Sequence, residues 1–220
     1  MVHGRNKRMK FFSTDSPVYK FMTRLWDIVK ISLLWLVCSI PVITIGPATA
    51  ALNKIALEMA DDAEGYVARD FLKAFRENFK SSILLGLIGV VAFYAVYLDI
   101  QFFQVTEGSS MLFLVAAIIT GFVCGMAFIY AFPLMARYEN TTFRTLKNSY
   151  DIATRYFLRT LFLAFIIAVE LVLFMWNYTL MFIGLLIGPG TIALTVCSFA
   201  IRFFREIEKE PGAVSEKEEK

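Results

Sequence analysis

Residues 111–136 read MLFLVAAIITGFVCGMAFIYAFPLMA, a stretch without a charged side chain. At about 1.5 Å per residue, a helix of this length exceeds the roughly 30 Å hydrocarbon core of a bilayer. Residues 82–103 and 157–176 are nearly as apolar. The chain of 220 residues is 58% hydrophobic and 19% charged. A soluble domain is about 45–50% apolar and about 25% charged. These runs predict an all-α, polytopic transmembrane bundle and exclude a soluble enzyme or a disulfide-stapled secreted module.

The Lys and Arg residues are spread unevenly over the segments that connect these runs. They are dense in four parts of the chain: before residue 25, over 53–81, over 137–156 and from 202. The connections 104–110 and 177–179 contain none. Basic residues concentrate in cytoplasmic loops. From residue 53 onward, this alternation predicts that the connecting segments and the C-terminal end lie in turn on the cytoplasmic side and on the external side, beginning and ending inside. The basic N-terminal segment, 1–16, should then also lie inside, which requires two passes before residue 53.

Pro41 is the expected turn between those two passes. Proline interrupts the hydrogen-bond ladder of a helix and disfavours helical conformation in the residue before it. We therefore expect a helix over 17–39, a bend at 39–41 and a returning helix over 42–60, as a full or a re-entrant hairpin. A single crossing with an external N-terminus is the alternative.

The complete expectation is one transmembrane domain, 17–205, in a cell membrane, with both termini cytoplasmic. It holds about six membrane segments in three hairpins: 17–39, 42–60, 82–103, 111–136, 157–176 and 180–204. The tail, 206–220, is charged and interrupted by Pro and Gly, and it is expected to be disordered.

A short repeat supports the first hairpin. Residues 45–52, IGPATAAL, match residues 187–194, IGPGTIAL, at six of eight positions. The second copy lies in the last segment, which returns to the inside. The segment that contains the first copy, 42–60, should therefore also return to the inside. We expect helix-break or packing roles for the prolines and glycines of these turns, namely Pro41, Gly46, Pro47, Pro133, Gly188 and Pro189. The spacings Gly121-x-x-x-Gly125 and Gly184-x-x-x-Gly188 predict helix packing within the bundle.

Two basic connections carry a helical stripe of apolar residues. In 66–80 the stripe is Val67, Phe71, Phe75 and Phe79, and in 143–157 it is Phe143, Leu146, Tyr150, Ala153 and Phe157. An aromatic stripe beside Lys and Arg is typical of an amphipathic helix in the headgroup plane, here on the cytoplasmic side. The alternative is a cytoplasmic extension of the transmembrane helix that follows.

Several strings in the first part of the chain are distinctive. They are SPVYKFM at 16–22, LWLVCSIPVITIGPATAAL at 34–52 and GYVARDF at 65–71, followed by Phe75 and by NFK at 78–80. Together they resemble the YesL-like family of bacterial membrane proteins, whose function is undefined, and the resemblance covers most of 11–205. Because members tend to be encoded near sugar-uptake systems and glycoside-degrading enzymes, the resemblance implies a role beside carbohydrate uptake. It brings no catalytic residues.

Glu170 is the ionisable residue expected deepest in the membrane, roughly 20 Å from the inner edge of the hydrocarbon core. An ionised carboxylate facing lipid costs several kcal/mol, so Glu170 should face the bundle interior, with Asn177 on the same helical face. We favour a protonated Glu170 that donates to a carbonyl freed by Pro189. Asp27 and Lys30, three residues apart on the first helix, are expected to form a structural pair.

Most catalytic constellations cannot be assembled from this chain. It has one His, His3, and three Cys that all lie in apolar segments. It has no phosphate-binding-loop or nucleophile-elbow motif, so we expect no catalytic, cofactor or metal residues. The favoured function is a non-enzymatic accessory, sensor or small permease-like component of carbohydrate uptake. The alternative is an intramembrane enzyme that acts on a lipid-linked or glycan substrate through carboxylates such as Glu170 and Asp99.

The expected partners follow from the apolar composition and the charge and, for the sugar importer, from the resemblance alone. A net charge of +3 is too small to indicate a nucleic acid. The candidates are the lipid bilayer, subunits of a sugar importer and further copies of this chain.

Overall fold

The computed structural model describes residues 17–61, 65–105, 110–138 and 141–208, and the expectations for 1–16 and for the tail beyond 208 lie outside them. Every element in the described residues is helical. The elements are α1 (Pro17–Cys38), η1 (Val42–Thr44), α2 (Ile45–Ala60), α3 (Val67–Glu77), α4 (Phe79–Val105), α5 (Ser110–Ile129), α6 (Ala131–Arg137), α7 (Thr142–Arg155), α8 (Phe157–Met175) and α9 (Tyr178–Glu208).

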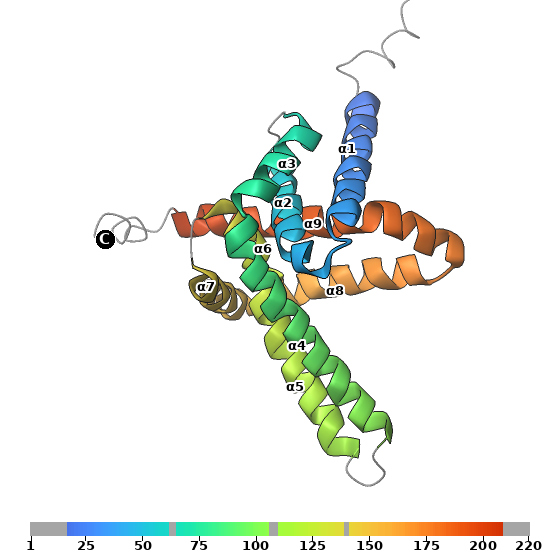
Figure 1. Cartoon of the computed structure of the whole chain (residues 1–220), viewed down its shortest axis with the longest axis vertical. Helices are drawn as coiled ribbons and strands as arrows, with labels where there is room; N and C mark the ends of the chain where they lie inside the picture. Colours follow the sequence, from blue (N-terminus) through green and yellow to red (C-terminus); the bar gives the residue numbers. More distant parts are fainter. Residues whose placement is uncertain (1–16, 62–64, 106–109, 139–140, 209–220) are drawn as a thin grey trace, which may run out of the picture.

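Three helical hairpins, α1–α2, α4–α5 and α8–α9, dominate the described structure (Figure 1). Four helical stretches within it are long and apolar enough to cross a membrane: Phe79–Gln104, Met111–Arg137, Phe157–Met175 and Tyr178–Ile207. The sequence therefore predicts a helical membrane protein correctly, but α1 and α2 are not among these candidate spans. A count of six spans is not confirmed.

The bend between α1 and α2 forms at Pro41. α1 ends at Cys38, the backbone of Pro41 is extended (φ −76°, ψ 125°), and α2 starts at Ile45. The hydroxyl of Thr44 lies 2.7 Å from the carbonyl oxygens of both Cys38 and Pro41 and donates to them. It thereby satisfies a carbonyl that the end of α1 leaves without a helical partner. The helix is therefore not continuous through Pro41, and the choice between a hairpin and a single crossing stays a prediction.

α2 lies at the centre of the fold and packs against α1, α3, α4, α6 and α9. Its crossing with α4 depends on two glycines. A Cβ on Gly46 would lie 2.1 Å from the carbonyl oxygen of Ser82, and a Cβ on Gly86 would lie 2.6 Å from the Cα of Gly46. Pro47 is buried in the first turn of α2, where the missing N–H costs no helical hydrogen bond.

The expected segment 111–136 is two helices, because the chain breaks at Tyr130 ahead of Pro133. Ser149 of α7 bonds to backbone groups on both sides of this break. Its hydroxyl accepts from the Tyr130 N–H (3.2 Å) and lies 3.5 Å from the Met126 carbonyl, to which it donates. The Tyr130 hydroxyl bonds to Thr160 of α8 (3.2 Å), which joins the α4–α5 and α8–α9 hairpins at their base.

The two amphipathic connections do form helices, but their apolar stripes behave differently from the expectation. The stripe of α3 packs on α1 and α2, with Phe71 fully buried, so this face is not available to lipid headgroups. On α7, Phe143 and Tyr150 are 72% and 42% exposed whereas Ala153 is buried, so the expected stripe is divided between the surface and the core, and its contact with lipid headgroups stays a prediction. The buried face of α7 is instead largely small and polar, because Ser149 must approach the broken end of α5.

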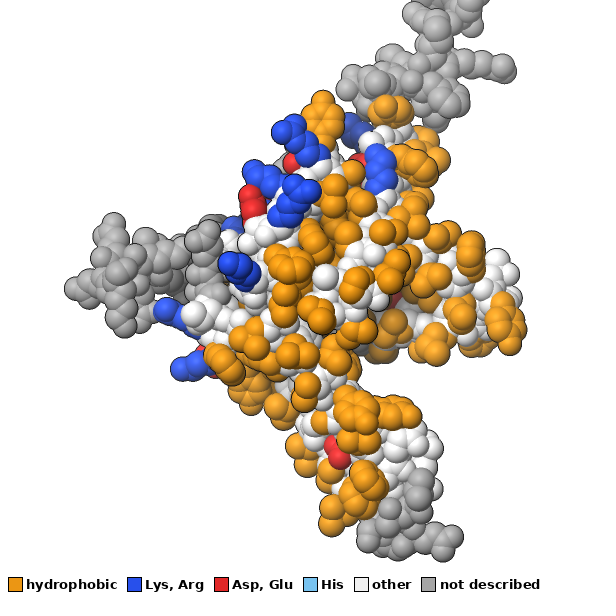
Figure 2. All heavy atoms as spheres, in the orientation of Figure 1, with side chains coloured by type: hydrophobic (Ala, Val, Ile, Leu, Met, Phe, Trp, Pro, Cys, Tyr) orange, Lys and Arg blue, Asp and Glu red, His pale blue; other side chains and the backbone are white. Residues whose placement is uncertain are grey.

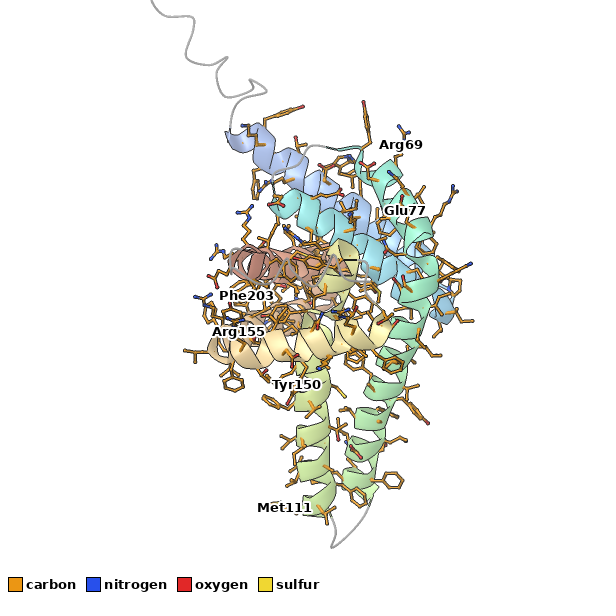
Figure 3. All side chains as sticks on the ribbon, turned by 90° about the vertical axis from the view of Figure 1, so that its left-hand side faces the viewer. Arg69, Glu77, Met111, Tyr150, Arg155 and Phe203 are labelled. Atoms are coloured by element: carbon orange, nitrogen blue, oxygen red, sulfur yellow. The ribbon has the colours of Figure 1, made fainter. Side chains whose placement is uncertain are left out.

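Charged side chains gather at the end of the molecule opposite the tips of the long hairpins. Figure 2 shows Lys and Arg over α3 and along the same edge, whereas hydrophobic side chains largely cover the α4–α5 and α8–α9 hairpins on this face. Figure 3 places Arg69 and Glu77 at one end and Met111 at the far tip of α5. The helix α9 continues to Glu208, where Arg159 reaches both carboxylate oxygens of Glu206 at 3.2 Å. Residues 206–208 are therefore helical, contrary to the expected start of the tail.

Candidate functional site

Glu170 of α8 faces α9, its neighbour in the same hairpin. The Thr195 hydroxyl donates to its Oε1 at 2.8 Å. Its Oε2 is buried and has no hydrogen-bond partner within the described parts of the chain. The carboxyl group thus turns away from lipid, but its partner is a hydroxyl and not a carbonyl freed by Pro189.

The other members of the expected polar site lie elsewhere. α8 ends at Met175, so Asn177 is exposed in the turn before α9 and does not share a helical face with Glu170. Asp27 and Lys30 of α1 form an ion pair at 2.9 Å, with Lys30 also 5.9 Å from the ring centroid of Trp26. The structure therefore does not bring the four residues together as one site.

Pro189 lies inside α9, where it interrupts the helical ladder. The next residue, Gly190, turns its N–H to the Ser32 hydroxyl of α1 (3.0 Å), and a Cβ there would lie 2.7 Å from that oxygen. This contact fastens α9 to α1. The sequence analysis assigns no role to Gly190 or Ser32. A glycine directly after a helix-interior proline is nevertheless a usable signal of close backbone approach.

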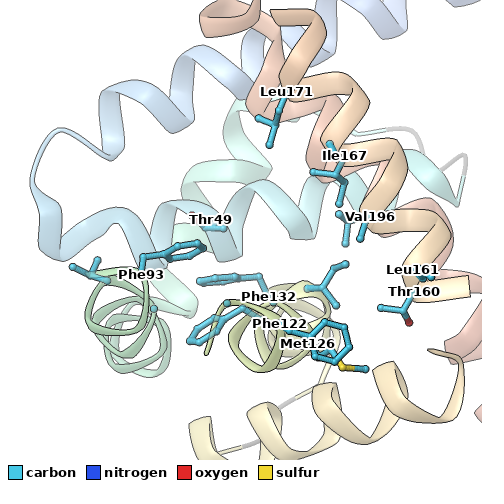
Figure 4. A pocket seen from close by; sticks show the side chains of 18 of the residues that line it. Thr49, Phe93, Phe122, Met126, Phe132, Thr160, Leu161, Ile167, Leu171 and Val196 are labelled. Atoms are coloured by element: carbon cyan, nitrogen blue, oxygen red, sulfur yellow. The ribbon is translucent and has the colours of Figure 1, made fainter. Parts of the chain in front are cut away.

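A cleft of about 690 Å³ lies between the two long hairpins (Figure 4). Its walls come from α4, α5 and α8, and Ile45 and Thr49 of α2 and Val196 of α9 close its base. A second cavity of about 480 Å³ continues from it towards α1 and α9. The two cavities share six lining residues: Thr49, Phe128, Ile129, Phe132, Leu171 and Val196.

The few polar side chains that line the cleft and the second cavity already bond within the protein. Thr49 donates to the Ile45 carbonyl (2.7 Å) and accepts from the Trp35 indole N–H (3.1 Å). Asn53 donates to the Thr49 carbonyl (2.8 Å). Thr160 bonds to the hydroxyl of Tyr130 and to backbone carbonyls. The lining therefore suits an apolar occupant better than a hydrated sugar.

The two G-x-x-x-G spacings end up in opposite situations. Gly184 and Gly188 face Phe174 of α8, as expected for packing within the bundle: Cβ atoms there would lie 2.6 Å and 3.4 Å from the Phe174 ring. Gly121 and Gly125 line the cleft. A Cβ on Gly121 would meet only Val96, at 3.9 Å, and one on Gly125 would have no described atom within 4 Å. For Gly125, the expectation of packing within the bundle is wrong.

Acidic residues do not cluster at membrane depth. Asp99 lies on α4 and Glu170 on α8, in different hairpins. In the described ranges no group of three or more His, Cys, Asp and Glu residues is placed to hold a metal ion. Within the described residues, the arrangement supplies an apolar cleft and, between α8 and α9, the Glu170 carboxyl group.

Comparison with protein families gives one match. Residues 28–100, which run from α1 to α4, match the model of a family described as protein of unknown function, DUF624. The match supports a likeness to an uncharacterised family over the part of the chain that includes the Pro41 bend and the Gly46–Gly86 crossing. No curated protein and no solved structure matches the chain significantly.

Proposed function

We propose that the protein is a non-catalytic accessory component of a bacterial cell membrane that accompanies carbohydrate uptake. We further propose that the cleft between the α4–α5 and α8–α9 hairpins receives one transmembrane helix of an importer subunit. The resemblance to the YesL-like family supports the place beside carbohydrate uptake. Its most distinctive string, residues 34–52, lies within the matched range 28–100.

The proposed topology has all three hairpins entering the membrane from the cytoplasmic side. The tips of the long hairpins point away from the charged end of the molecule, in agreement with the alternation of Lys and Arg (Figure 2). The 16 residues of α2 span about 24 Å, less than the roughly 30 Å core. We therefore take α1–α2 as a re-entrant hairpin, with α3 and α7 on the cytoplasmic side together with both termini.

The open glycine face of α5 is the observation that carries the docking proposal. Gly121 and Gly125 lie one turn apart on the wall of the cleft, and Gly125 has open space where a side chain would be. Small residues at this spacing let two helix backbones approach closely, and the resulting van der Waals contact drives helix association in lipid. An acyl chain has no such need for glycine, so a helix is the occupant that explains this wall.

Affinity purification from native membranes tests the proposal with two matched variants. Gly125→Phe fills the cleft, whereas Val123→Phe adds a ring to the same helix at a position that is 47% exposed and outside the cleft. We expect importer subunits to co-purify with the wild type and with Val123→Phe. Gly125→Phe should reduce their yield at least about tenfold, because a blocked helix contact loses more than about 1.4 kcal/mol.

Three results would contradict the proposal. One is the absence of importer subunits from the wild-type eluate. Another is an equal loss with both variants, which would report a general effect of an added ring on α5. The third is full retention of the subunits by Gly125→Phe, which would place the contact outside the cleft.

A further inference from the structure

A second, polar pocket of about 1,120 Å³ lies between α2, the start of α4, α6 and the start of α7, away from the apolar cleft. The described side chains that line it carry three positive charges, on Lys54, Lys80 and Arg137, and one negative charge, on Glu77. Glu77 also lies 3.9 Å from Lys73, which is outside the pocket. The described lining therefore has a clear excess of positive charge.

Lys54 and Lys80 have no ion-pair partner within 4.0 Å in the described part of the chain. Lys54 is partly buried on α2, where the burial of a charged group is costly. Its electrostatic neighbour Glu58 is itself partly buried. Desolvation raises the pKa of this carboxyl, and the nearby charge of Lys54 lowers it.

Two helices begin at this pocket. Lys80 and Ser81 belong to the first turn of α4, and Thr142 begins α7. The Thr142 hydroxyl donates to the Ser81 carbonyl at 3.3 Å, which holds the two helix starts together. Neither first turn contains an acidic residue, and Thr141 makes no side-chain cap on α7. Helix starts carry partial positive charge, so both add to the charge of the lysines.

We infer that this pocket binds a phosphate group, held by Lys54 and Lys80 between the starts of α4 and α7. Phosphate oxygens accept charge-assisted hydrogen bonds from several directions, as a pocket lined by two lysines and two helix starts requires. The group belongs either to the headgroup of an anionic lipid or to a free phosphorylated molecule. Basic pockets between helices at the cytoplasmic face of a membrane protein bind lipid headgroups in this way.

Thermal unfolding of the full-length protein in neutral detergent micelles tests the inference. Inorganic phosphate is titrated against chloride at matched ionic strength, and phosphatidylglycerol is titrated against phosphatidylcholine. A ligand that binds the folded state raises the unfolding midpoint in a saturable way. In Lys54→Gln/Lys80→Gln we expect an apparent dissociation constant at least about tenfold higher. The control, Lys20→Gln/Lys147→Gln, removes the same charge from exposed positions outside the pocket.

The two titrations distinguish the sources of phosphate. A midpoint that rises with inorganic phosphate indicates a free phosphorylated ligand, and one that rises only with phosphatidylglycerol indicates a headgroup. The inference is overturned if the wild type responds to neither. It is equally overturned if the pocket variant and the control respond alike, since the effect would then be general charge screening.

Ser81→Glu gives an independent check that does not remove a lysine. Its carboxylate would sit beside Lys80 in the first turn of α4, where negative charge is favourable. The variant should therefore unfold at a higher temperature without ligand and respond to neither phosphate nor phosphatidylglycerol. A Ser81→Glu protein that binds like the wild type contradicts the inference.

Discussion

The two long hairpins carry the same glycine spacing and use it in different ways. In α8–α9 the ring of Phe174 occupies the notch formed by Gly184 and Gly188, and the Glu170–Thr195 bond ties the two helices together. In α4–α5 the notch at Gly121 and Gly125 has no such ring in it and opens onto the cleft. The spacing alone therefore does not tell whether a hairpin fills its own notch. Whether a hairpin fills its own notch depends on whether a bulky residue, such as Phe174, lies opposite it.

The largest effect should come from a glycine that is already in contact with backbone. In Gly46→Ala the new Cβ would lie 2.1 Å from the Ser82 carbonyl oxygen, which cannot rotate away. We expect a loss of about 3 kcal/mol or more in the free energy of unfolding, measured by denaturant titration in micelles. Gly125→Ala is the matched control and should change stability by less than about 1 kcal/mol. Equal losses of stability in the two variants would contradict the distinction between a glycine in contact with backbone and a glycine that faces open space.

A smaller loss is expected where the notch of α8–α9 is filled by a side chain. In Gly184→Ala the Cβ would lie 2.6 Å from Cγ and 2.7 Å from Cβ of Phe174, so the ring must move. We expect a cost of about 1–3 kcal/mol. In Gly184→Ala/Phe174→Gly both contacting atoms of residue 174 are absent, so the double variant should be more stable than the sum of the single losses. Strict additivity would show that Phe174 does not fill the notch.

The smallest effect should come from the polar pair of the same hairpin. Glu170→Gln keeps the shape and an acceptor for Thr195, so folding, stability and cellular function should be normal. A double-mutant cycle between Glu170→Ala and Thr195→Val should give a coupling of about 0.5–1.5 kcal/mol, as for other hydrogen bonds between membrane helices. Normal stability of Glu170→Gln with lost function would instead make the carboxyl proton essential and contradict a structural role.

Much of the fold is predictable because its causes are local. The break at Pro41 follows from the geometry of proline, and it appears as the end of α1 at Cys38 and the start of α2 at Ile45. The four candidate spans follow from length and apolar composition. These features need no knowledge of what packs against each helix.

The candidate site was less predictable because its contacts join distant segments. Ser149 faces inward because it serves the Tyr130 N–H, 19 residues earlier, and an apolar stripe cannot report that bond. Asn177 does not share the face of Glu170 because α8 ends at Met175, within one residue of the expected end at 176, so the helical periodicity does not extend to Asn177. The repeated octapeptides also differ in context, since Pro47 lies in a first turn and Pro189 in a helix interior.

Cysteine labelling in intact cells and inverted vesicles tests the topology of the three hairpins most directly. Single cysteines are placed at Ser13, Asn177 and Glu216 after the native Cys38, Cys124 and Cys197 are replaced. If all hairpins enter from the cytoplasmic side, an impermeant reagent labels position 177 from outside and positions 13 and 216 only from inside. Labelling of position 13 from outside, with position 216 protected, would contradict the re-entrant placement of α1–α2 and the shared entry side.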